Sequence, residues 1–165
     1  LIIYSAIQAY YAIAGNFESK SSYHPHTKPV ILGILICIFI EIIIGTEIRG
    51  GLDMSRKENP LIEGVILLKM LGPFKYMHTI LGFTLLGLTI YLWKIVNDIK
   101  FISSSFMVNS VNFMMGLIIT QIILGEALVF LEVKPLMQLF HMWFSSLLVG
   151  LSVASFTFYK ISIEQ

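Results

Sequence analysis

Two histidines, His78 and His141, each follow a proline by a few residues near the start of a long apolar segment. Two imidazoles on opposite helices can bind a haem iron from both sides. His78 lies about five residues past Pro73 and His141 about six past Pro135. A rise of about 1.5 Å per residue places both side chains near 8 Å inside their helices. We therefore expect two imidazoles at one depth, on helices that run in the same direction.

The composition indicates an integral membrane protein. Hydrophobic residues make up 56% of the 165 residues and charged residues only 13%, and the mean hydropathy is +0.83, far above that of a soluble domain. The net charge of +1 argues against nucleic acid as a partner. Cys37 is the single cysteine, so no disulfide or thiolate cluster can form within this chain.

Four segments are long enough to cross about 30 Å of hydrocarbon at about 20 residues each. They are residues 30–48, 76–96, 109–131 and 136–158. Residues 1–14 are apolar but too short, and we interpret them as the end of a truncated transmembrane helix, followed by a cytoplasmic-side loop at 15–29. We predict an all-α integral membrane protein in which residues 30–158 form a four-helix haem-binding transmembrane bundle, with a partial N-terminal helix before it and a tail at 159–165.

The chain contains an internal repeat that predicts symmetry within this bundle. Residues 40–45, IEIIIG, match residues 120–125, TQIILG, at an offset of 80. Two pseudo-symmetric helical hairpins would place equivalent residues opposite each other. Gly45 and Gly125 then fall at the depth of the histidines. A glycine at that depth would leave room for the edge of a flat macrocycle, so both are candidate cofactor-binding residues.

Small and polar residues continue from each histidine at helical spacing and predict that both rings face the interior of the bundle. One stripe contains Ser145, Leu148, Ser152 and Ser155, and the other contains Gly82, Leu85 and Thr89. For any single serine or glycine, ordinary packing between helices is the simpler explanation. For the histidines, the alternative is a neutral imidazole hydrogen-bonded within the bundle.

Other polar residues allow two interpretations each. Glu41 must be neutralised or hydrogen-bonded within the membrane, with Gln121 as the expected partner, and the alternative is a role in proton delivery. Arg49 is expected to end its helix at the level of the haem, either pairing with a propionate or extending to the membrane interface. His24 and His26 lie in a polar loop without a third ligand, which is typical of an ordinary loop.

These residues together carry a resemblance to a known family. The run from Glu41 through Gly45 to Arg49 resembles the Q-x-x-x-G-x-x-V-R helix end of the heme A synthase family, with glutamate in the place of the glutamine. The helix around His78 resembles its haem-ligand helix, and residues 121–125 followed by His141 complete a second hairpin. The resemblance covers residues 30–158 and the C-terminal half of that family, and residues 1–14 resemble the end of the preceding half.

The resemblance implies a function, a cofactor and a location. The family oxidises haem O to haem A for cytochrome oxidase assembly, and His78 and His141 would be the axial ligands of a haem b iron. The protein would be a multi-pass protein of the bacterial plasma (inner) membrane, or of the mitochondrial inner membrane, with its haem toward the outer face. The implied partners are membrane lipid, haem O and haem A, haem O synthase and cytochrome oxidase subunits.

The sequence also departs from the catalytic half of that family. Lys75 stands three residues before His78 where that half has a glutamate, and Gln138 stands three before His141. Thr79 replaces an arginine that often follows the ligand, and residues 49–75 lack a cysteine pair. We therefore expect this half to relay electrons or to be structural, and assign no catalytic residue. The alternatives are a membrane b-type cytochrome that acts only in electron transfer and a non-haem structural or transport bundle.

Overall fold

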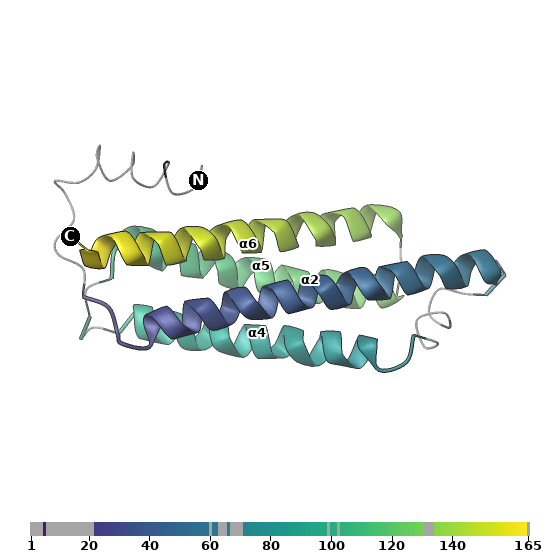
Figure 1. Ribbon diagram of the computed structural model, residues 1–165, viewed down its shortest axis with the longest axis horizontal. Helices are drawn as coiled ribbons and strands as arrows, with labels where there is room; N and C mark the ends of the chain where they lie inside the picture. Colours follow the sequence, from purple (N-terminus) through teal and green to yellow (C-terminus); the bar gives the residue numbers. More distant parts are fainter. Residues whose placement is uncertain are drawn as a thin grey trace.

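Four long helices form the bundle, which is shown in Figure 1. The computed structural model describes residues 5, 22–59, 61–62, 66, 71–98, 100–101, 103–130 and 134–164. The helices are α2 (Thr27–Glu58), α4 (Phe74–Val96), α5 (Ser105–Phe130) and α6 (Pro135–Glu164). Each is long and apolar enough to cross a membrane. The predicted all-α, four-helix membrane bundle is confirmed, whereas the partial helix predicted at 1–14 lies outside the described residues apart from residue 5.

The helices are arranged so that each packs against two neighbours. α2 packs against α4 and α6, and α5 packs against the same two helices. In this ring α4 and α6 are diagonally opposite, as are α2 and α5. The chain passes from α2 to α4 and from α5 to α6 at one end, on the right of Figure 1, and from α4 to α5 at the other. The two helices that carry the histidines therefore run in the same direction, as predicted.

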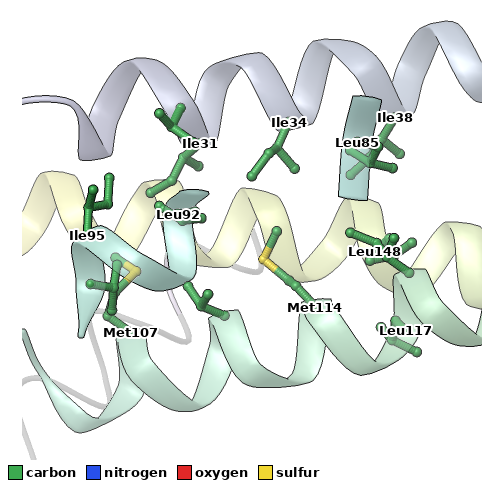
Figure 2. Close-up of a cluster of buried hydrophobic side chains, with 14 of the residues drawn as sticks. Ile31, Ile34, Ile38, Leu85, Leu92, Ile95, Met107, Met114, Leu117 and Leu148 are labelled. Carbon is green, nitrogen blue, oxygen red and sulfur yellow. The ribbon is translucent and has the colours of Figure 1, made fainter. Parts of the chain in front are cut away.

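One fully buried part of the core lies at the end of the bundle away from the histidines. Ile31, Leu92, Met107 and Phe158 are fully buried there, one from each helix, and Figure 2 shows three of them among their neighbours. Lipid is as apolar as these side chains, so van der Waals packing rather than transfer from water stabilises this contact. This end holds the four helices together and fixes their relative positions.

Both predicted stripes face the interior of the bundle. Leu85 and Leu148 are buried, and Thr89, Ser152 and Ser155 are completely so. Thr89 and Ser155 donate hydrogen bonds to carbonyl oxygens one turn earlier in their own helices, which satisfies the hydroxyl hydrogen where no water is at hand. The small side chains let the helices approach closely, and the rings at the head of each stripe therefore point toward the same interior.

α2 is longer than predicted and corrects the expectation that it ends at Arg49. It continues to Glu58 and has 32 residues, about 48 Å at the usual rise, against about 30 Å of hydrocarbon. Residues 49–58 are strongly charged, so they end the membrane span but not the helix, whose backbone hydrogen bonds persist into water. Leu52 is buried in this extension and packs with Leu71. A Cβ on Gly51 would overlap the Leu71 side chain, so the glycine admits this contact.

The remaining boundaries differ less. α6 continues through most of the predicted tail to Glu164. A short apolar run at 61–68 lies between Pro60 and Pro73, and most of it is outside the described residues. Thus the chain positions two long helical hairpins whose α2–α4 and α5–α6 connections lie at the same end as the two histidines.

Candidate functional site

His78 and His141 lie beside each other within the bundle. His78 is in the second turn of α4 and His141 in the second turn of α6, and their ring centres are 6.3 Å apart with planes inclined at 57°. Both residues are half-buried. Because α4 and α6 are diagonal in the bundle, the two rings approach from opposite sides of its interior. The depth predicted from helical rise thus coincides with an actual pairing in space.

The two glycines predicted to accompany the histidines lie on the other two helices. A Cβ built on Gly45 of α2 would be 3.5 Å from Cε1 of His78, and one on Gly125 of α5 would be 3.8 Å from Cε1 of His141. Each distance is an ordinary van der Waals contact, so each glycine backbone lies directly alongside one imidazole. Every helix therefore contributes one residue to this level of the bundle: two rings and two positions without a side chain.

Arg49 also reaches this end of the bundle, although it does not end its helix. Its Nη1 donates to Sδ of Met142 at 2.7 Å, and Met142 directly follows His141 in α6. The guanidinium is exposed, lies close to the second histidine, and has donor hydrogens available beyond this one contact. It can therefore offer positive charge to an anionic group at the rim of the site.

The carboxylate of Glu41 contacts His78 rather than Gln121, so the predicted pairing of Glu41 with Gln121 is wrong. Oε2 of Glu41 lies against Nδ1 of His78. Gln121 instead donates through Nε2 to the carbonyl oxygen of His141 at 2.7 Å and to Oγ of Ser145 at 3.0 Å. The reason is the order of the four helices around the bundle. Because α2 and α5 are diagonally opposite, the bundle interior separates Glu41 from Gln121. Each side chain instead reaches the adjacent helix that carries a histidine.

The contact between Glu41 and His78 is the feature of this site that the sequence interpretation missed. Its signal was present, because Glu41 precedes Gly45 by one turn and so shares the face of α2 that lies against His78. The equivalent ring nitrogen of the second histidine, Nδ1 of His141, has different surroundings. Nδ1 of His141 and Oε1 of Gln121 are buried, and neither has a hydrogen-bond partner among the described residues.

The donor set restricts which metal group this level of the bundle fits. Over the described residues no group of three or more histidines, cysteines, aspartates or glutamates comes together, whereas a bare zinc site uses three or four protein ligands. Two imidazoles are the axial set for an iron already held by a porphyrin. Metal–nitrogen bonds of about 2 Å, with about 1.1 Å from ring nitrogen to ring centre, place two such ring centres about 6 Å apart.

The observed residues fit such a group. The separation of the ring centres, 6.3 Å, agrees with that of two imidazoles bound to one iron, and the glycines provide clearance beside each ring. Arg49 supplies a cation at the rim. This fit concerns the side chains of His78, His141 and Arg49 and the two glycine positions, which come from all four helices.

Comparison with known proteins gives one finding. A family model described as cytochrome oxidase assembly protein matches residues 1–153, which include α2, α4, α5 and the part of α6 that carries His141. No curated protein and no solved structure matches the chain.

Proposed function

We infer the function of this chain from its membership of the cytochrome oxidase assembly protein family, whose model matches residues 1–153 and which is the heme A synthase family that the sequence resembles. At the level of the family this is an oxidoreductase that acts in cytochrome oxidase assembly, and the four spanning helices make the chain a multi-pass membrane protein. We propose that its bundle binds haem b through His78 and His141. We propose further that it serves heme A synthesis, the oxidation of haem O to haem A, by relaying electrons or by a structural role.

One observation carries the proposal. The rings of His78 and His141 lie 6.3 Å apart across the interior, on helices that run in the same direction, beside Gly45 and Gly125. Ionisable residues within a membrane usually face a functional interior, and an imidazole pair at one depth is one ligand set that makes a haem six-coordinate. A haem held there supplies a one-electron iron couple.

The residues of the chain have separate tasks in this proposal. His78 and His141 would bind the iron, and the backbones at Gly45 and Gly125 would allow the macrocycle edge to approach α2 and α5. Arg49 would pair with a propionate, because a guanidinium forms strong hydrogen bonds with a carboxylate. The surrounding apolar helices exclude bulk water and so limit exchange of protons with the site.

Relay rather than chemistry is supported by the residues beside the ligands. Lys75, three residues before His78, places its ammonium 4.7 Å from the ring centre of Tyr76, so this position offers a cation and not the carboxylate found in the catalytic half of the family. We propose that the site faces the outer side of a bacterial inner membrane, or of the mitochondrial inner membrane. The proposed partners are lipid, haem O and haem A, haem O synthase and cytochrome oxidase subunits.

The proposal is tested by haem loading of the purified chain in detergent. We expect the absorption and electron paramagnetic resonance spectra of a six-coordinate, low-spin haem b. H78A and H141A should each lose this spectrum or convert it to a five-coordinate form. H24A and H26A are the matched controls, because both histidines lie outside the bundle interior and should leave the spectrum unchanged. Unaltered spectra in both H78A and H141A would exclude the ligand assignment.

A second measurement separates a synthase unit from a simple cytochrome. The haem-loaded protein is supplied with haem O together with an electron donor and dioxygen, and products are separated by chromatography. Saturable binding of haem O supports the synthase assignment, whereas formation of haem A by this chain alone would contradict its role as an electron relay. Reversible reduction and oxidation without either result would support the membrane b-type cytochrome instead.

A further inference from the structure

The two histidines differ in what holds the ring nitrogen that faces away from the proposed iron. Nδ1 of His78 lies in ion-pair contact with Oε2 of Glu41, and neither atom has a hydrogen-bond partner among the described residues. Nδ1 of His141 is buried without a partner in the same part of the chain. The residue equivalent to Glu41 by the repeat, Gln121, binds the backbone carbonyl of His141 rather than its ring.

The surroundings of Glu41 hold its carboxylate in place. Its side chain is only 13% exposed, and the other oxygen, Oε1, lies 3.2 Å from the position that a Cβ on Gly82 would occupy. Gly82 is one turn after His78 on α4, so the carboxylate lies between α2 and α4, against the ring on one side and the glycine on the other. A carboxylate buried in hydrocarbon is strongly destabilising unless it is paired, and the imidazole N–H is the partner that the geometry offers.

We propose that Glu41 is a positioning residue that accepts a hydrogen bond from Nδ1–H of His78 and makes this histidine the more electron-donating of the two axial ligands. The proposal rests on the proposed haem-binding function. A hydrogen bond from Nδ1 leaves Nε2 as the nitrogen with a free lone pair, which fixes the tautomer and the orientation of the ring. The nearby negative charge raises the basicity of the ligand and favours ferric over ferrous iron.

The first test is the midpoint potential of the haem-loaded chain. E41Q keeps the shape of the side chain but removes its charge, and we expect the ratio of ferrous to ferric binding to rise about tenfold, an upward shift of about 59 mV for one electron. The matched control is E47Q, since Glu47 is an exposed carboxylate on the same helix and should leave the potential unchanged. Q121E should shift the potential downward by placing a second carboxylate on the His141 side.

A merely structural role of Glu41 would give a different result. If E41Q retains the six-coordinate, low-spin spectrum but its potential equals that of the wild type, the proposal is overturned. A shift of equal size in E47Q would also overturn it, because the effect would then be one of general surface charge.

The second test does not depend on haem. In the haem-free chain with ¹⁵N-labelled histidine, we expect the nuclear magnetic resonance signal of His78 to show a protonated, hydrogen-bonded Nδ1 that changes in E41Q and not in E47Q. A His78 signal insensitive to E41Q would overturn the hydrogen bond itself. A wild-type chain that shows this bond but takes up no haem would instead overturn the proposed function, together with the tuning of the potential, so the two failures are distinguishable.

Discussion

Gly45 and Gly125 allow a direct test of whether the bundle interior is shaped for a flat ring. The perturbation is the addition of one methyl group at either position, G45A or G125A. In the haem-free bundle the new Cβ would lie 3.5 Å from Cε1 of His78 or 3.8 Å from Cε1 of His141. Both distances are ordinary contacts, so neither substitution forces a rearrangement of the folded chain.

The expected free-energy changes of these two substitutions have opposite signs for folding and for haem binding. Alanine is a better helix former than glycine by about 1 kcal/mol, so each variant should match or exceed the haem-free stability of the wild type by up to that amount. In the loaded site the methyl group would occupy space required by the macrocycle edge. Overpacking typically destabilises by about 1–3 kcal/mol, which corresponds to haem affinity weakened roughly 5- to 150-fold.

The assay is a pair of titrations on each purified variant, one of denaturant against helicity and one of haem against absorbance. G50A and G116A are matched controls, since Gly50 lies on α2 and Gly116 on α5 and a Cβ on either would meet nothing within 4 Å. They should gain the same helical stability while binding haem as the wild type does. If G45A and G125A bound haem as tightly as these controls, the glycines would not be clearance for a macrocycle and the reasoning would fail.

Two further predictions concern the ends of the bundle. G51V on the extension of α2 should displace Leu71, whose side chain a Cβ at that position would overlap. Faster hydrogen exchange and proteolysis near Leu71 than in G50V would show this, and equal rates would contradict it. F158A should destabilise the bundle by about 3–5 kcal/mol, since Phe158 is fully buried. I163A is its exposed control on the same helix, and similar unfolding midpoints for the two would contradict the position of the core.

Much of the fold was predictable because long apolar runs in a sequence identify membrane-spanning helices. The direction and depth of His78 and His141 followed from segment length and helical rise alone, and the inward stripes followed from helical periodicity. The extension of α2 past Arg49 was not predictable from hydropathy, which records where hydrocarbon ends and not where backbone hydrogen bonding ends. Gly50 and Gly51 indicate a helix end in many contexts, but here the packing of the extension outweighs that tendency.

The partner of Glu41 was missed for a different reason. The repeat correctly made Glu41 and Gln121 equivalent, but equivalence by a twofold axis does not imply contact. In a ring of four helices, equivalent residues lie on diagonal helices, and contact is with the neighbours. Only side chains on or close to the axis can meet, as His78 and His141 do. The order of the helices around the bundle therefore determines the partners of Glu41 and Gln121. The residue periodicity within a single helix does not predict that order.

In this bundle, the positions of the two imidazole rings and the chemical surroundings of those rings depend on different residues. The depth of His78 and His141 depends on where α4 and α6 begin, and so on connections and core packing to which many residues contribute. Their difference depends on one pair of symmetry-related positions, a carboxylate against the ring on one side and an amide against the backbone on the other. In the proposed haem site, residue 41 or 121 alone would therefore change the electron density on the iron, while the residues that hold the iron stay in place.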